Sequence, residues 1–159
     1  MPSPAVVELL EKAGVEYVVH RHDAIRTGED ILARTVFTGD DVLNSVKTLA
    51  FGLLSGVIVL AAIPGPGRIR YGQLASAVGA RRQDVRPAGP DLLGRLDMEP
   101  GGVTPLCAHP AVTVVVDTAV TGMGRVLCGS GRSDCTLEVA SSDVMGVVPG
   151  IVVADIATL

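Results

Sequence analysis

The sequence predicts an α+β fold, with one domain over residues 1–159 in which helices pack on a curved, mixed and largely antiparallel β-sheet. The chain length suits one ordinary hydrophobic core. Segments with helical spacing alternate with short apolar runs, and the longest apolar run divides into two strands at a Ser-Gly turn. With 48% hydrophobic and 19% charged residues, the composition is that of a globular chain and not of a disordered one.

The first helix and strand are marked by residues that begin and end such elements. Ser3 and Pro4 are favoured at the N-cap and in the first turn, so they predict a helix over residues 5–13. Gly14 would end that helix. Residues 15–22 follow as an expected strand.

The next elements are a short helix and a hairpin. Residues 27–30, Thr-Gly-Glu-Asp, resemble a capping box and predict a helix that continues to residue 36. Residues 47–54 and 57–63 are expected to form two largely buried strands, joined by a Ser-Gly turn.

The alternation continues to the end of the chain. Helices are expected at residues 71–78, at residues 90–96 and from Ser141 onward, and strands at residues 112–116, 125–128, 136–140 and 151–156. Only a few turn residues separate the strand at 112–118 from the strand at 125. We therefore expect these two strands to pair with each other in antiparallel fashion.

Charge and composition exclude several functions. The net charge is −4, and the chain has two Phe, two Tyr and no Trp, which argues against a nonspecific RNA-binding domain. The N-terminus lacks the basic and apolar regions of a signal peptide, and the apolar run at residues 49–63 is too short to span a bilayer. We expect a cytoplasmic protein without membrane contact.

No metal and no cofactor are expected. Cys107, Cys128 and Cys135 are odd in number and have no paired spacing, which favours free thiols over disulfides or a zinc site. Without an obvious base beside them, the cysteines are not expected to act as nucleophiles. His20 and His22 are expected on opposite faces of their strand, where they would not share a metal ion.

One lysine is chemically conspicuous. Of the 13 Lys and Arg residues only Lys12 and Lys47 are lysines, and Lys47 stands at the mouth of the longest apolar run. Two interpretations are open at this point. Lys47 is either a strand-end lysine whose methylenes cover apolar surface, or a functional cation.

A cluster of arginines lies in an otherwise acidic chain. Residues 68–86 contain five of the eleven arginines against the single acid Asp84. This excess of positive charge indicates either a solvated helix boundary or a docking surface for phosphates. The five residues, called the arginine patch below, are Arg68, Arg70, Arg81, Arg82 and Arg86.

Two glycine segments are candidates for ligand binding. In residues 101–105, Gly-Gly-Val-Thr-Pro, the glycines allow backbone conformations closed to other residues, so amide groups could converge on a ligand oxygen. An ordinary turn is the alternative. Residues 128–131, Cys-Gly-Ser-Gly, follow a strand and do not match the phosphate loop of nucleotide hydrolases.

Taken together, these segments resemble one protein family. The order of HRHDA, SVKTLAF, GGVTPL, VVVDTAV and TLEVASSDV is similar to that of the YbaK/ProRS-associated domain family. Its members are free-standing aminoacyl-tRNA deacylases related to the editing insertion domain of bacterial prolyl-tRNA synthetase. The resemblance covers about residues 4–157, and the Lys-Thr pair and the Gly-x-x-x-Pro loop are its most specific parts.

The resemblance implies a trans-editing hydrolase that cleaves the ester bond of a mischarged tRNA, most directly tRNA(Pro) carrying Cys, Ala or another small amino acid. Its expected partners are aminoacyl-tRNA and prolyl-tRNA synthetase. The essential lysine falls on Lys47, which would orient the terminal-adenosine phosphate or the ester, while water or a cysteinyl substrate's own thiol attacks. We expect the arginine patch to dock the tRNA acceptor stem. The expected substrate-binding residues are His20, Thr48, Gly101, Gly102, Val103, Thr104, Pro105, Gly129, Ser130 and Thr136.

The chain departs from some relatives at two pocket positions. It has His20-Arg21-His22 where those relatives have a tyrosine, and Thr136 where they have an aspartate. The amino acid that is removed therefore stays open, and His20 or His22 has either a structural or a proton-transfer role. A catalytically silent module that binds a small ligand or a protein is the alternative function. The presence of Lys47 together with the complete glycine loop favours the deacylase.

Overall fold

The computed structural model describes residues 1–25 and 37–159, and its central element is a five-stranded mixed sheet in the order β5-β2-β3-β6-β9. The hairpin of β2 and β3 is antiparallel, as is β5 against β2, whereas β6 runs parallel to β3 and β9 runs parallel to β6. All seven residues of β3 are buried because both faces of the sheet are covered. The five strands are β2 (Val46–Leu53), β3 (Ile58–Pro64), β5 (Val85–Pro87), β6 (Val112–Asp117) and β9 (Val152–Ala154).

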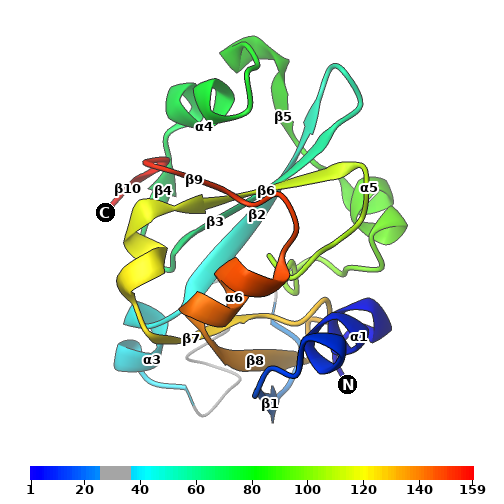
Figure 1. Cartoon of the computed structure of the whole chain (residues 1–159), viewed down its shortest axis with the longest axis vertical. Helices are drawn as coiled ribbons and strands as arrows, with labels where there is room; N and C mark the ends of the chain where they lie inside the picture. Colours follow the sequence, from blue (N-terminus) through cyan, green and yellow to red (C-terminus); the bar gives the residue numbers. More distant parts are fainter. Residues whose placement is uncertain (26–36) are drawn as a thin grey trace.

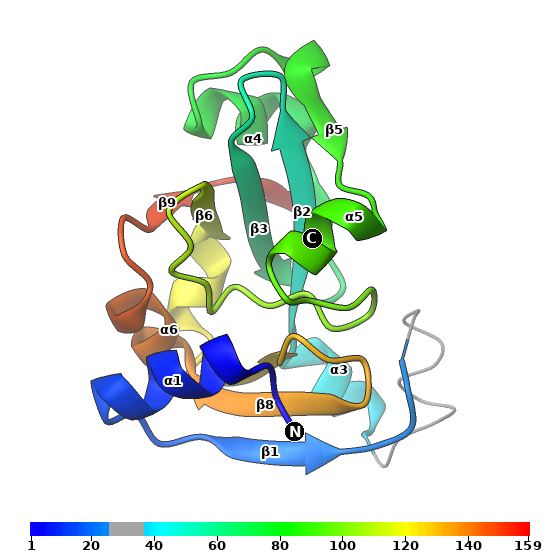
Figure 2. The same ribbon diagram turned by 90° about the vertical axis from the view of Figure 1, so that its right-hand side faces the viewer.

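A second sheet, of three antiparallel strands in the order β1-β8-β7, lies at one end of the long axis of the molecule (Figures 1 and 2). A parallel bridge between Ser45 and Leu127 connects it to the start of β2. The short strands β4 (Arg68–Ile69) and β10 (Ala157–Thr158) pair separately. The strands of the second sheet are β1 (Val18–Arg21), β7 (Arg125–Gly129) and β8 (Cys135–Ala140).

The helices cover the two sheets from different sides. Helices α1 and α6 join the three-stranded sheet and one face of the five-stranded sheet in the first apolar cluster, whereas α4 packs on the other face in the second cluster. In Figure 1, α4 and the three-stranded sheet lie at opposite ends of the molecule. The helices are α1 (Pro4–Ala13), α3 (Gly39–Leu43), α4 (Tyr71–Ala77), α5 (Pro90–Arg95) and α6 (Ser141–Val147), with 3-10 turns η1 (Arg82–Asp84) and η2 (Thr118–Gly122). None of the helices in the described part of the chain has the length and apolar character to cross a lipid bilayer.

The predicted fold class is confirmed, and so are most of the predicted elements. Gly14 ends α1 in the left-handed conformation, with φ of 69°. Ser3 precedes α1, but its hydroxyl donates to a carboxylate oxygen of Asp97 at 3.0 Å and does not cap the helix. Helix α3 was not predicted, although Thr38 and Asp41 form its capping box. The capping box and helix expected at residues 27–36 lie outside the described residues.

The expected antiparallel pairing of the strand at 112–118 with the strand at 125 is wrong. Strand β6 lies between β3 and β9, and β7 pairs with β8. The physical reason is burial, because Val114, Val115 and Val116 are all at most 2% exposed. Because side chains alternate between the two faces of a sheet, three successive buried residues require other elements packed on both faces. An inner parallel strand has such elements on both faces, whereas a strand in a short hairpin does not. The turn η2 then carries the chain away from the five-stranded sheet.

Asp117 fixes the end of β6. Its carboxylate is 4% exposed and accepts the Ala119 amide of η2 at 3.0 Å. The other oxygen accepts the amides of Ile156 and Ala157 at 2.8 and 3.0 Å. One side chain therefore holds both the turn after β6 and the C-terminal segment.

We predict that Asp117→Ala lowers the free energy of unfolding by about 3 kcal/mol, because buried amides lose a charged acceptor. Chemical denaturation measures this change. Asp155→Ala removes a nearby exposed carboxylate and serves as the control, with an expected change within about 0.5 kcal/mol. Equal stabilities of the two variants would show that the Asp117 bonds contribute nothing.

Candidate functional site

A pocket of about 530 Å³ lies beside β2, where the neighbouring strands leave it uncovered. Strand β5 pairs with β2 only from Phe51 onward, and the bridge to β7 is at Ser45. Between these points the edge of β2 faces the pocket, and segments from both sheets close it. The volume falls in the range of small-molecule sites. The lining includes Phe37, Asp41, Val46, Lys47, Thr48, Ala50, Leu93, Gly101, Val103, Leu127, Cys128, Gly129, Cys135 and Thr136.

Lys47 and Thr48 both line the pocket but direct their side chains to opposite faces of the sheet, because side chains alternate along a strand. The Lys47 ammonium donates to the Gly67 carbonyl at 2.7 Å. Partial burial, and secondarily the charge of Arg68, lowers the pKa of Lys47 below its ordinary value. In the described ranges, neither Lys47 nor Arg68 has a carboxylate partner. Two cations therefore lie near each other without a compensating anion.

Thr48 carries an unsatisfied polar atom. The residue is 8% exposed, and its hydroxyl oxygen makes no hydrogen bond to the part of the protein that the structure describes. Buried hydroxyls without partners are rare because desolvation costs free energy that no bond returns. Thr48 therefore adds an unsatisfied hydroxyl to the pocket wall, and a ligand reaches this oxygen only if the surrounding atoms move.

The glycine loop at residues 101–105 packs directly against the backbone that follows β7. A Cβ atom on Gly102 would overlap the backbone of Arg132, and one on Gly129 would overlap the Val103 carbonyl oxygen. The Gly131 amide donates to the Gly102 carbonyl at 2.7 Å. Gly101 has φ of 86°, as expected for a glycine-specific conformation, whereas Gly102 is required by close packing alone.

The loop offers fewer free amides than expected. The Gly102 amide donates to Glu99 O at 2.9 Å, so it is not available to a ligand. Within residues 1–25 and 37–159, the amides of Val103 and Thr104 have no protein acceptor. Gly101 and Val103 line the pocket. Among the described residues the Gly101 amide also has no protein acceptor, so the free amides at the pocket are those of Gly101 and Val103.

Five predicted substrate residues do not line the pocket: His20, Gly102, Thr104, Pro105 and Ser130. Thr104 is fully buried, and its hydroxyl accepts the Leu106 amide at 3.1 Å. Pro105 is also buried. Ser130 is fully buried and donates to the Cys135 carbonyl at 2.7 Å. Thr104, Pro105 and Ser130 therefore pack behind the residues that line the pocket.

His20 and His22 lie on the same face of the strand, so the expectation of opposite faces is wrong. Side chains two residues apart in a strand share a face. Both rings contact Phe37 edge-on, with centroids 5.4 Å and 5.9 Å away. His20 bonds Glu138 at 2.9 Å and is not in the pocket lining, whereas His22 bonds the pocket residue Thr136 at 2.8 Å. Sequence reasoning did not select His22 as a binding residue.

Glu138 is held by two partners. The hydrogen bond from Arg125, and secondarily that from His20, keeps the pKa of Glu138 below its ordinary value. Arg125 Nε lies 2.6 Å from one carboxylate oxygen. Glu138, held by Arg125, bonds His20 outside the pocket lining. These contacts favour a structural role for His20.

The cysteines near the pocket are poor nucleophiles. Cys128 is 2% exposed, and burial raises the pKa of its thiol to about 12. Cys135 is also buried, and its sulfur lies 3.1 Å from the Ser130 hydroxyl. In the described part of the chain no group of three or more His, Cys, Asp or Glu side chains could hold a metal ion.

The arginine patch is distributed over β4, the start of α4, η1 and β5. Arg81 pairs with Asp84 at 3.1 Å, and Arg82 stacks over the Tyr71 ring at 5.0 Å from its centroid. Arg68 lies close enough to Lys47 to lower its pKa. Arg86 precedes Pro87, which lines the pocket. The patch therefore begins beside the pocket and continues toward α4.

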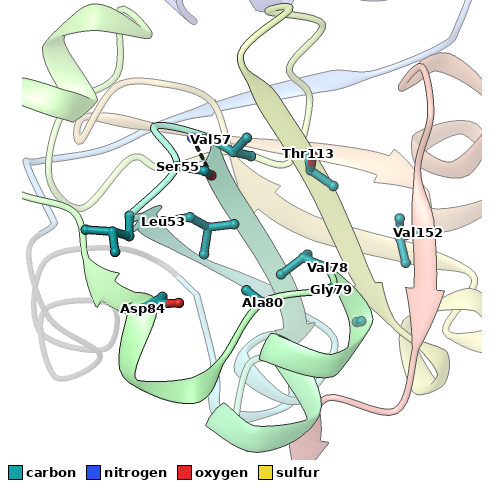
Figure 3. Close-up of a pocket in the computed structure, with 11 residues that line it drawn as sticks. Leu53, Ser55, Val57, Val78, Gly79, Ala80, Asp84, Thr113 and Val152 are labelled. Carbon is teal, nitrogen blue, oxygen red and sulfur yellow. Dashed lines mark hydrogen bonds between the residues drawn. The ribbon is translucent and has the colours of Figure 1, made fainter.

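A second pocket, of about 430 Å³, lies at the hairpin turn of β2 and β3 and lacks functional side chains (Figure 3). Leu53, Val57, Val78 and Val152 give it apolar walls. Its one carboxylate, Asp84, is paired with Arg81. None of the residues predicted to bind substrate lines it, so the pocket beside β2 is the candidate site.

We predict that Gly129→Ala displaces the glycine loop, lowers stability by about 2 kcal/mol and weakens ligand binding, because the new methyl group overlaps the Val103 carbonyl. Gly146→Ala, in open space within α6, is the matched control and should not lose stability. Thermal unfolding and a crystal structure of each variant test this. An unmoved loop in the Gly129 variant would contradict the prediction.

Comparisons with known proteins agree with this geometry. The chain resembles the crystal structure of a hypothetical protein, with a TM-score of 0.79 and 25% identity over 97% of this chain and 99% of that one. A proposed trans-editing enzyme for prolyl-tRNA synthetase has a TM-score of 0.76 and 24% identity, with both chains fully covered. A proposed signal-transduction protein from Marinobacter aquaeolei VT8 shares the fold at 16% identity and a TM-score of 0.70, over 98% of this chain and 31% of that one. No curated protein shows significant sequence similarity to the chain.

The sequence profile of the aminoacyl-tRNA editing domain matches residues 22–147, which is most of the chain. This range includes Lys47, the glycine loop and Thr136. The protein belongs to the aminoacyl-tRNA editing domain family.

Proposed function

We propose that the protein is a trans-editing deacylase that hydrolyses the ester between a wrongly attached small amino acid and tRNA(Pro). Membership of the editing-domain family supports an aminoacyl-tRNA substrate. The fold shared with a proposed trans-editing enzyme for prolyl-tRNA synthetase supports tRNA(Pro) and a functional link to that synthetase.

The pocket beside β2 is the observation that carries this proposal. It brings together Lys47, Thr48, the glycine loop and Thr136, which are far apart in the sequence. Its wall contains an orphaned buried hydroxyl, that of Thr48, among the described residues. Such a hydroxyl fits a ligand with several hydrogen-bonding oxygens, as an aminoacyl ester of ribose has.

Lys47 and Arg68 are assigned to a phosphate of the tRNA end. Their charges lie near each other without a carboxylate partner in residues 1–25 or 37–159. A phosphate between them would neutralise both and place the adjoining ribose ester at the edge of β2. This assignment favours phosphate binding over direct contact with the ester.

In the proposed reaction the pocket positions the ester for attack by water. A water molecule adds to the ester carbonyl, the bond from the carbonyl carbon to the ribose oxygen breaks, and that oxygen takes a proton. The products are a free amino acid and a tRNA with a free terminal hydroxyl. The free amides of Gly101 and Val103, which both line the pocket, are suited to stabilising the developing oxyanion. Cys128 is not a candidate nucleophile, because burial raises the pKa of its thiol.

The shape of the pocket favours small amino acids. Val46, Ala50, Leu93 and Leu127 contribute apolar surface, and the glycine loop closes one side at a fixed distance from β7. Alanine or cysteine side chains need little volume and no charged partner. The side-chain subsite therefore selects mainly by size.

We predict that the wild-type protein releases alanine or cysteine from mischarged tRNA(Pro) and that Lys47→Ala lowers kcat/KM at least about 100-fold. The fold should survive, because the exposed lysine leaves no core cavity. Lys12→Ala replaces the chain's other lysine, on α1, and should keep full activity. Turnover is measured with a panel of mischarged tRNAs. A wild-type protein that releases no amino acid from any of them would refute the proposed deacylase.

We predict that the double charge reversal Arg81→Glu and Arg82→Glu raises KM for aminoacyl-tRNA while sparing a minimal aminoacyl-adenosine ester, which has no acceptor stem. Each lost phosphate contact should reduce the slope of log affinity against log salt by roughly 0.7 to 0.9. Arg95→Glu, on α5 outside the patch, is the charge-matched control. Equal losses on both substrates would assign the two arginines to the fold or the pocket and not to tRNA docking.

A further inference from the structure

The wall of the pocket formed by β8 contains a hydrogen-bonded pair, His22 and Thr136. His22 Nε2 lies 2.8 Å from the Thr136 hydroxyl oxygen, and His22 Nδ1 lies 2.7 Å from the Asp23 carbonyl oxygen. Phe37 packs against the His22 ring with an interplanar angle of 70°. Thr136 and Phe37 both line the pocket.

These contacts determine which atom carries each proton. A carbonyl oxygen only accepts hydrogen bonds, so Nδ1 of His22 must carry a proton and donate to Asp23. In the neutral ring Nε2 is then an acceptor, and the Thr136 hydroxyl donates to it. In this neutral arrangement the Thr136 hydroxyl proton is used in the bond to His22, and the oxygen presents its lone pairs to the pocket.

We propose that His22 holds Thr136 as an acceptor for the α-ammonium group of the aminoacyl substrate. The inference rests on the proposed deacylase function and adds how the substrate is oriented. The ammonium group needs an acceptor, which the apolar side chains of the lining do not provide. Thr136 is on β8, in a different sheet from Lys47, so the positive end of the substrate is kept apart from the cations that bind the phosphate.

Asp41 is the competing acceptor. It lines the same pocket and carries a formal charge. One of its carboxylate oxygens, Oδ2, accepts the Thr38 amide at 2.8 Å and the Thr38 hydroxyl at 3.2 Å, within the capping box of α3. The carboxylate is thus oriented toward the start of its own helix, which favours Thr136 as the ammonium acceptor.

The test compares two adenosine esters, one with an alanyl group and one with a propionyl group, which differ only in the α-amino group. We expect Thr136→Val to lower kcat/KM for the alanyl ester roughly 10- to 100-fold, the range for losing a hydrogen bond to a charged group. Hydrolysis of the propionyl ester should change less than about twofold. Thr136→Ser keeps the hydroxyl and should retain most of the preference for the alanyl ester.

His22 is tested as a positioning residue by a pair of variants. His22→Leu removes the acceptor for the Thr136 proton and should reduce the preference for the alanyl ester, whereas His22→Gln can restore an acceptor oxygen and should recover it. A residue that only supported the fold would affect both esters alike. Thermal unfolding of each variant shows whether the fold is retained.

The outcomes separate this inference from the proposed function. Equal losses on both esters, or a preference abolished by Asp41→Asn and kept in Thr136→Val, would overturn the inference and leave the deacylase intact. If the wild-type protein hydrolyses neither ester and no mischarged tRNA, the proposed function is wrong. Calorimetry with the non-hydrolysable 3′-alanylamido and 3′-propionylamido adenosines then decides whether Thr136 discriminates the amino group.

Discussion

The site depends on one contact between two stretches of backbone. Gly102 lies against the backbone of Arg132, and Gly129 lies against the carbonyl of Val103, with no space for a Cβ atom at either position. This contact fixes the glycine loop to the end of β7, and through it one wall of the pocket to the opposite wall. A binding site between two sheets needs a fixed distance between its walls. Without it, mobile side chains would determine the largest ligand that the pocket accepts.

The alternation of side chains along β2 separates two kinds of chemistry. Thr48 shares its face of β2 with Val46 and Ala50 of the first apolar cluster, whereas Lys47 shares its face with Leu49 and Phe51 of the second. Adjacent residues of one rigid strand thereby reach different parts of a ligand. Under the proposed function, the Lys-Thr pair at the start of the hairpin would contact the phosphate and the ester of one substrate at the same time. A lysine on a flexible loop would lose this fixed relation to the threonine.

Local patterns in the sequence predicted most elements, but not how they are arranged. Gly14 and the Ser55-Gly56 turn act within a few residues, so α1 and the hairpin could be recognised from the sequence. The parallel partners of β6 depend on burial at both faces, and the short loop to β7 suggested the wrong pair. For the site, Lys47 and the glycine loop followed from the family resemblance. His22 and Phe37 did not, because their roles arise from contacts between β1, β8 and the segment before α3.

Under the proposed function, the charges around the pocket would make the enzyme prefer an amino acid attached to tRNA over the free amino acid. Burial and the charge of Arg68 both disfavour the ammonium form of Lys47, as the lowered pKa shows. An incoming phosphate relieves the repulsion between these two cations and stabilises the protonated lysine. A free amino acid has no phosphate, so it cannot gain this interaction, and its α-carboxylate would be positioned differently from an ester. Part of the binding free energy is thus available only to a ligand with both a phosphate and an aminoacyl group, which is the combination found at the end of a charged tRNA.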